Sequence, residues 1–187
     1  MDRTYVYHLG LSVEARSPFH RHWCWPFAKP LDTGLLESAA ETIVGEHSFK
    51  AFRKSGQPER GDRCTIHESC WEPWGDLGLT LKITADRFLH HMVRYLVGTM
   101  VNIAVGKRPL EDLRRLLEEP ETDLRTSPPA PPTGLFLHHV TYPAQSTTPG
   151  KSSPRSDRAS ETEPPSRTGL SSSSEGRSPS PTEQVTQ

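Results

Sequence analysis

The sequence predicts an α+β fold, in which an antiparallel or mixed sheet is flanked by helices. Segments that alternate apolar and polar residues occur near Tyr5 and near Leu135. Two further β-like runs follow one another around residue 75. Between these segments apolar residues recur at helical spacing, and strands and helices do not alternate regularly along the chain. Mixed strands and helices of this kind are typical of the α+β class.

Composition divides the chain of 187 residues into two parts. Residues 144–187 contain 12 Ser and 6 Pro, no aromatic residue, and 5 basic against 5 acidic side chains. Because such a segment cannot bury enough apolar surface to offset the entropy lost on ordering, we expect a disordered tail. Residues 1–143 hold every Trp, Tyr, Phe, Cys and His, and they are long enough for one domain with its own core.

Several other classes of protein are disfavoured. Residues 1–5 resemble no secretion signal, and the longest apolar segment, 88–105, is interrupted by His90, His91 and Arg94, so we expect no membrane span. Three cysteines without framework spacing indicate reduced thiols and a cytoplasmic protein. The formal net charge of −1 does not by itself indicate nucleic-acid binding.

The first half of the domain contains a strand, a helix and a hairpin. Residues 4–13 alternate with Tyr5 and Tyr7 on one face, which predicts a strand. Asp32 is the expected N-cap of a helix that reaches Val44. Residues 64–71 and 77–85, separated by a turn-forming segment, predict an antiparallel hairpin.

The second half contains two helices, a loop and a final strand. Asp86 is expected to cap an apolar helix that reaches about Val105, and a shorter helix follows Pro109. The proline-rich residues 126–133 predict a loop. Alternation over residues 134–142 predicts the last strand.

Arg94 is the most informative residue of the apolar helix. A guanidinium buried in mid-helix costs several kcal/mol without a partner, so it requires a carboxylate or a phosphate. No acidic residue of the ordered part is an obvious partner, although an internal ion pair and a side chain that reaches out to solvent both remain open. The partner of Arg94 is therefore expected to come from outside this chain.

Histidine and cysteine patterns raise two weaker hypotheses. His90 and His91 are adjacent, so on a helix they point about 100° apart and are better read as surface or interface residues than as a metal pair. Cys64, His67 and Cys70 suggest zinc, but in a strand His67 points to the opposite face from the cysteines and no fourth ligand is evident.

A basic region with two phenylalanines, residues 49–63, is the candidate RNA contact. Its cations would neutralise phosphates, with bases close to Phe49 and Phe52; a solvated loop is the alternative. The candidate RNA-binding residues, with the two histidines included, are Lys50, Arg53, Lys54, Arg60, Arg63, His90 and His91.

These segments together resemble one enzyme family. The order Arg3-Thr4-Tyr5-Val6-Tyr7, Gly45-Glu46-His47-Ser48-Phe49, His90-His91-Met92-Val93-Arg94 and Gly134-Leu135-Phe136-Leu137 is similar to the C-terminal half of a TruA-type tRNA pseudouridine synthase. The resemblance covers about residues 3–143 and implies a pseudouridine synthase-like fold.

The resemblance implies an activity and three site residues. Enzymes of this family isomerise uridine to pseudouridine in the anticodon stem-loop of tRNA, with no cofactor and no metal. The target uridine leaves the stack, and an aspartate acts as nucleophile on the nucleoside. Tyr5 corresponds to the tyrosine that stacks on the target base, and Leu135 to an apolar residue against the uracil. Arg94 corresponds to the catalytic arginine that pairs with the aspartate and positions it.

One part of the family pattern is missing from the 187 residues. The nucleophile of the family lies in a Gly-Arg-Thr-Asp-x-Gly-Val-His segment upstream of the Tyr5 strand, and no such segment occurs here. We therefore expect no turnover from this polypeptide alone, whether it is a fragment, a mis-called start, half of a split gene or a decayed copy.

The sequence leaves two functions in competition. The first is the pocket-completing part of a tRNA pseudouridine synthase that binds the tRNA anticodon arm, as a homodimer or with a separate N-terminal half. The second is a non-catalytic RNA-binding or dimerisation module derived from that fold. In either case the strand at residues 4–13 is expected to lack a sheet neighbour, which would make the isolated chain poorly soluble.

Overall fold

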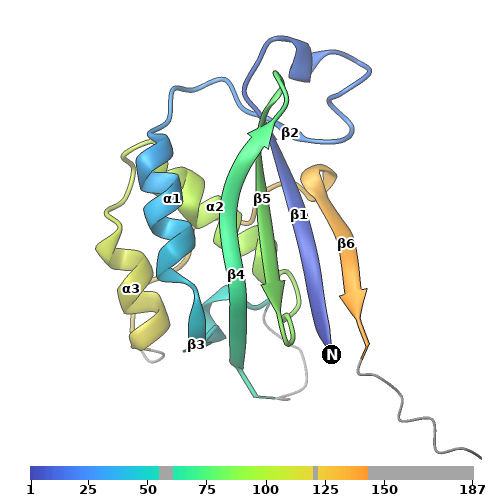
Figure 1. Cartoon of the computed structure of the whole chain (residues 1–187). Coiled ribbons are helices and arrows are strands. Elements are labelled where there is room, and N and C mark those ends of the chain that lie inside the picture. Colours follow the sequence, from blue (N-terminus) through green and yellow to red (C-terminus); the bar gives the residue numbers. More distant parts are fainter. Residues whose placement is uncertain (55–60, 120–121, 143–187) are drawn as a thin grey trace, which may run out of the picture. The chain divides into compact units, whose positions relative to one another are not determined.

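The computed structural model describes residues 1–54, 61–119 and 122–142. One sheet and three helices account for most of them, and all three helices lie on the same face of the sheet (Figure 1). The fold is α+β, as predicted. In chain order the elements are β1 (Asp2–Gly10), β2 (Trp25–Pro26), α1 (Thr33–Thr42), β3 (Gly45–Ser48), β4 (Arg63–Trp74), β5 (Gly78–Ala85), α2 (Met92–Ala104), α3 (Glu111–Glu118) and β6 (Leu135–Thr141), with short 3₁₀ turns at Glu14–Arg16, Lys50–Phe52 and Pro132–Gly134.

Strand β1 has neighbours along both of its edges. It pairs antiparallel with β5 on one side, while β6 and the short parallel strand β2 share the other side. The prediction that this strand lacks a neighbour is therefore wrong. Since β6 comes last in the described sequence, its pairing with β1 was not visible in the local pattern around either strand.

The predicted hairpin is confirmed as β4 and β5. The strands pair from Trp74 opposite Gly78 to Ile66 opposite Ala85, and the register shifts between Ile66 and Glu68. Beyond β4, the four-residue β3 completes the order β2-β1-β5-β4-β3. Strand β3 was not predicted, because four residues that include Glu46 and His47 show no apolar alternation.

The core lies between the sheet and the helices. Side chains of β1, β5 and β4 that share one face of the sheet point into it, as do the apolar faces of the helices. Among the described residues that are fully buried, the largest side chains include Tyr7, Phe49, Phe52, Leu36, Leu81, Ile83, Leu96 and Met100. Each aliphatic side chain buried in this way contributes about 1.5–3 kcal/mol.

The two predicted caps have different outcomes. Asp32 caps α1, with its Oδ1 accepting from the backbone N–H of Leu35 over 3.1 Å. Asp86 does not cap α2, because α2 begins at Met92. The Oδ1 of Asp86 accepts instead from the backbone N–H groups of Thr65 and Arg87, at 2.9 and 2.7 Å. Asp86 therefore ties the end of the hairpin to the segment that leads into α2.

Two glycines allow the chain to approach itself closely. A Cβ on Gly98 of α2 would collide with the carbonyl oxygen of Pro128, so the proline-rich loop lies directly on the helix. A Cβ on Gly134 would lie 2.7 Å from the carbonyl oxygen of His8, where the chain enters β6. Together these contacts fix the loop between α2 and β1.

Within the described ranges, no helix is long and apolar enough to cross a membrane. The predicted tail, residues 144–187, lies outside the described residues, and Tyr142 is the last one described. The proposed division into residues 1–143 and 144–187 stays a prediction.

Candidate functional site

A pocket of about 360 Å³ lies where β1 and β6 meet the segment leading into α2. Tyr5 of β1 and Leu135 of β6 line it, together with residues 88–93. In the pairing of β1 with β6, Leu137 lies opposite Tyr5 and Leu135 opposite Tyr7. Since side chains alternate along a strand, Tyr5 and Leu135 share a face of the sheet. Both predicted substrate-binding residues thus line the same pocket.

The ring of Tyr5 is held edge-on against Phe88. Their centroids are 5.1 Å apart and the planes meet at 85°. Aromatic pairs prefer this arrangement, which adds about 0.5–1.5 kcal/mol beyond the area that they bury. Tyr5 remains half-buried, so part of its ring stays accessible from the pocket.

His91 stands at the turn into α2 in a left-handed backbone conformation, with φ at 65°. It is the one non-glycine residue with positive φ among those described. Met92 N–H donates to the carbonyl of Leu89 over 3.0 Å, and Tyr95 N–H donates to that of His91 over 3.1 Å. For a residue other than glycine this backbone conformation costs of order 1 kcal/mol or more. Such residues are often found at functional sites.

The sequence predicts that His90 and His91 lie on the surface of the helix. They lie before it instead, because α2 starts only at Met92. Their rings lie 4.1 Å apart, and both line the pocket. Burial lowers the pKa of His91, and the positive charges of His90, Arg94 and Lys54 lower it further. His91 is therefore predominantly neutral near neutral pH, when it can donate one hydrogen bond and accept another.

Arg94 lies in the first turn of α2 and is half-buried. Arg94 does not line the pocket, although its neighbour Val93 does. Its Nε donates to the carbonyl oxygen of Ala130 over 2.7 Å. Of the acidic side chains that the structure describes, none forms an ion pair with Arg94. The partner found in this part of the chain is thus a backbone carbonyl rather than a carboxylate.

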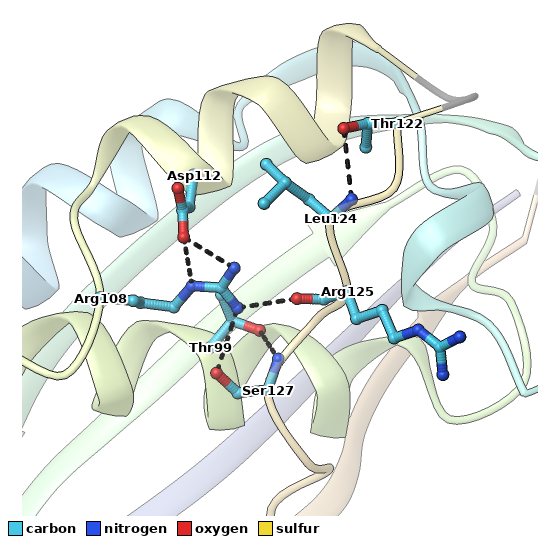
Figure 2. Close-up of polar contacts among 7 residues, drawn as sticks. All are labelled: Thr99, Arg108, Asp112, Thr122, Leu124, Arg125 and Ser127. Atoms are coloured by element: carbon cyan, nitrogen blue, oxygen red, sulfur yellow. Dashed lines mark hydrogen bonds and ion pairs between the residues drawn. The ribbon is translucent and has the colours of Figure 1, made fainter.

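The loop that carries Ala130 is itself anchored by Arg108 (Figure 2). The Nε and one terminal nitrogen of Arg108 donate to Oδ2 of Asp112, at 3.1 and 2.9 Å. The other terminal nitrogen donates to the carbonyl of Arg125 and to Oγ of Ser127, at 3.1 and 3.3 Å. Ser127 N–H in turn donates to Oγ1 of Thr99 over 3.3 Å. The loop is therefore pinned to both α2 and α3.

The basic region is only partly arranged as expected. Phe49 and Phe52 are fully buried in the core, so they cannot stack on an RNA base. Lys50 lies in the 3₁₀ turn between them, followed by Arg53. Lys54 is exposed, and its backbone N–H donates to the carbonyl of His90 over 3.1 Å. This bond brings the part of the basic region around Lys54 next to a residue that lines the pocket.

Of the other two cations proposed in this region, the structure describes only Arg63. Arg63 begins β4 and its Nε pairs with Glu46 over 2.7 Å, with both side chains largely exposed. Arg60 lies outside the described residues. The structure thus brings Lys54, His90 and His91 together near the pocket, whereas Arg63 lies opposite Ser48 on β4 and pairs with Glu46.

The hypothetical zinc ligands do not converge. Cys64 is buried in the core, where burial raises the pKa of its thiol to about 11. His67 is exposed and lies 3.5 Å from Asp2, and the Cys70 thiol donates to Glu72 over 3.6 Å. In the described ranges, no three His, Cys, Asp or Glu side chains are grouped to hold a metal ion.

Two parts of the site were not recognised from sequence. One is Phe88 and Leu89, which line the pocket, and the other is the proline-rich loop, whose Ala130 carbonyl accepts from Arg94. Phe88 and Leu89 continue the apolar pattern of α2, which concealed the change of backbone direction at His91. The only available signal was the cluster of prolines close to Gly134, which indicates a loop but not what the loop contacts.

Comparison with known proteins bears on this arrangement. Residues 39–143 match the family model described as tRNA pseudouridine synthase. The chain is 36% identical over 148 residues to tRNA pseudouridine synthase A of Burkholderia mallei (strain SAVP1), covering 79% of this chain and 54% of that protein. It is also 36% identical over 140 residues to tRNA pseudouridine synthase A of Dictyoglomus thermophilum, covering 75% and 56%. The chain spans about half the length of the curated relatives that it matches.

Proposed function

Because the chain belongs to the tRNA pseudouridine synthase family, we propose that it forms the uridine-binding part of an enzyme that makes pseudouridine in the anticodon arm of tRNA. The observation that carries the proposal is the pocket in which Tyr5 and Leu135 face the entrance to α2. A base that is to be modified must leave its stack and enter such a pocket. The accessible part of Tyr5 would stack on the uracil, with Leu135 packed beside it.

Arg94 would position the nucleophile. Its Nε is bonded to Ala130, so its two terminal nitrogens can receive an aspartate. A guanidinium binds a carboxylate strongly and in a fixed orientation. The aspartate would come from a segment outside these 187 residues, in the same polypeptide or in a separate N-terminal half. In that arrangement the aspartate would attack C1′ of the nucleoside as the bond from C1′ to N1 breaks, and the freed uracil would rotate. C5 would then bond to C1′ as the aspartate leaves, C5 would lose its proton, and N1 would take one up.

The cations near the pocket would bind the RNA backbone. His90 and His91 line the pocket, and the backbone N–H of Lys54 donates to the carbonyl of His90. Lys50 and Arg53 come just before Lys54 in the same segment. The lysine and arginine charges would neutralise phosphates, which gives affinity that falls as salt rises. The predominantly neutral His91 would contribute hydrogen bonds instead. An enzyme acting on tRNA in this way would work in the cytoplasm, where we place the protein.

Reconstitution tests the proposal. The chain is mixed with the aspartate-bearing N-terminal half of one of its relatives and a tRNA transcript, and the pseudouridine formed is counted. Product is expected only when both halves are present. Tyr5→Leu should abolish it, whereas Tyr142→Leu should not, because Tyr142 is an exposed tyrosine beyond β6. Unchanged product from the Tyr5 variant would contradict the proposed pocket.

An exposed aromatic row favours a homodimer. On the face of the sheet without helices, His8 stacks on Trp74 with centroids 4.5 Å apart, and Phe136 lies 5.4 Å from His8. Trp23 continues the row 6.1 Å from Phe136 and is 57% exposed. Apolar surface of this kind commonly marks an interface. We propose that a second copy of the chain covers it.

The same row favours the second candidate function, a non-catalytic RNA-binding or dimerisation module. Sedimentation of the wild-type chain and of a Trp23→Ser variant distinguishes the outcomes. A wild-type dimer that becomes monomeric in the variant supports the interface, and a wild-type monomer contradicts it. A dimer that binds tRNA but yields no product after reconstitution would favour the module over the enzyme.

A further inference from the structure

A second pocket, of about 270 Å³, lies on the far part of α2. Its walls come from β2 and the residues that follow it, from the second half of α2 with the turn after it, and from the proline-rich loop. Between Val93, in the first pocket, and Asn102, in the second, α2 rises by about 14 Å. The two pockets share no lining residue. The second pocket is therefore a separate site at one end of the same helix.

Flat apolar groups form much of this pocket. Trp25 and Phe27 meet edge to face, with centroids 5.2 Å apart, and both are only half-buried. Pro128 and Pro129 lie on the other side, held against the helix because Gly98 has no side chain. Aromatic faces of this kind stack on nucleic-acid bases, whatever the base, with a contribution of about 1–3 kcal/mol per base.

Two lysines stand at the rim. Lys29 and Lys107 both line the pocket and are exposed. Neither forms an ion pair with a described acidic residue. The pocket therefore joins an aromatic wall to two positive charges, which is complementary to a base and its phosphates.

Asn102 adds a hydrogen-bonding group. It is half-buried in the pocket wall, and its side-chain amide has no hydrogen bond to any described residue. An amide offers both donors and an acceptor, as the edge of a base requires. At about 270 Å³ the pocket lies near the lower limit for small-molecule sites, which fits one nucleotide rather than a longer segment.

We propose that this second pocket binds one unpaired nucleotide of the RNA whose target uridine enters the first pocket. The base stacks on Trp25 and Phe27, its edge bonds to Asn102, and Lys29 and Lys107 neutralise the adjoining phosphates. The proposal rests on the proposed function, since it assumes that the ligand is RNA. It adds a contact that holds the RNA at a point away from the reacting base.

Salt dependence of binding tests the lysines. The full chain, the double variant K29A/K107A and the control R114A/R115A are titrated with a fluorescent anticodon stem-loop RNA at several salt concentrations. The control removes the same charge from α3, where both arginines pair with glutamates. The slope of log affinity against log salt should become shallower by about 1.4–1.8 in the double variant, since each phosphate contact contributes about 0.7–0.9. The control should keep the wild-type slope.

Crosslinking tests the aromatic wall without any substitution. The wild-type chain is irradiated with the same RNA carrying 4-thiouridine, and the crosslinked peptides are mapped. The peptide with Trp25 and Phe27 should carry RNA, in addition to peptides of the first pocket. The proposal is overturned if the slope of K29A/K107A equals that of the wild type, or if no crosslink reaches this peptide. RNA binding with both signatures but no pseudouridine after reconstitution would overturn the isomerase proposal alone.

Discussion

Arg94 and Ala130 are hydrogen-bonded to each other in both directions. The Nε of Arg94 donates to the carbonyl oxygen of Ala130 over 2.7 Å, and the N–H of Ala130 donates to the carbonyl oxygen of Arg94 over 2.9 Å. The orientation of this guanidinium therefore depends on a loop far away in the sequence.

Replacing Arg94 separates binding from catalysis. Arg94→Lys keeps the positive charge but has only one nitrogen. It cannot donate to the Ala130 carbonyl and also form two parallel hydrogen bonds to a carboxylate, as a guanidinium can. In the reconstituted enzyme, single-turnover product formation should fall about 100-fold, the cost of misplacing a reacting group. Affinity for tRNA should stay within about twofold, since the charge remains. Full activity of Arg94→Lys would show that the arginine does not position the nucleophile.

Removing Arg108 should loosen the loop. Arg108→Ala leaves Asp112, Ser127 and the Arg125 carbonyl without their shared donor, and the side chain is only 13% exposed. The free energy of unfolding should fall by about 2–3 kcal/mol in urea titrations. Hydrogen exchange at the Ala130 amide should also accelerate.

Arg114→Ala is the control for Arg108. Its ion pair with Glu111 is mostly exposed, so the loss should be about 0–0.5 kcal/mol. Equal losses in the two variants would mean that the contacts of Arg108 do not secure the loop.

The contact of α2 with the proline-rich loop predicts an unusual outcome for a helical glycine. Gly98→Ala should destabilise the fold by about 1–3 kcal/mol, because the added methyl group collides with the backbone of Pro128. Gly34→Ala is the control, because its Cβ would meet no backbone atom and would lie 3.2 Å from Oδ1 of the exposed side chain of Asp32. It should stay within about 0.5 kcal/mol of the wild type, as the preference of alanine for a helix offsets this contact. Thermal melts of both variants measure the difference, and a stabilised Gly98 variant would refute the close contact.

His8 should make stability depend on pH. Burial lowers the pKa of His8, whose Nδ1 lies 2.8 Å from Oγ1 of Thr80. The unfolded chain therefore binds more protons than the native one as pH falls below about 6.5, and the free energy of unfolding decreases there. Urea midpoints at about pH 7.5 and about pH 5.5 measure the loss. His8→Gln should reduce it, and an unchanged loss in that variant would exclude His8 as the cause.

Most elements were predictable because their patterns are local. The alternation around Tyr7 and the cap at Asp32 identify β1 and α1 without tertiary information. The start of α2 was not predictable in this way. Phe88 and Leu89 are as apolar as the helix, but the bond from Lys54 to His90 and the tie from Asp86 to Thr65 hold that segment in a turn. Long-range contacts of this kind override a local period.

The site was predictable only in part. The periods of the two strands predict that Tyr5 and Leu135 lie on strands, and the resemblance to the family supplied their roles. That both line one pocket depends on the pairing of β1 with β6, which no local pattern shows. The pairing of Arg94 with Ala130 has no sequence signal, because a loop without periodicity gives no register. Phe49 and Phe52 were assigned to an RNA surface because they stand among cations, whereas their rings lie in the core.

The pairing of Asp2 with Thr141 also bears on how the chain is made. As β1 leaves the ribosome, β5 is not yet synthesised, and β6 follows only after the helices. Contacts between residues so far apart in the sequence slow folding, because a long loop must close before they form. The backbone groups along both edges of the nascent β1 therefore stay unpaired until β5 and β6 have been synthesised. A chaperone that covers these edges during translation is expected to raise the yield of folded protein.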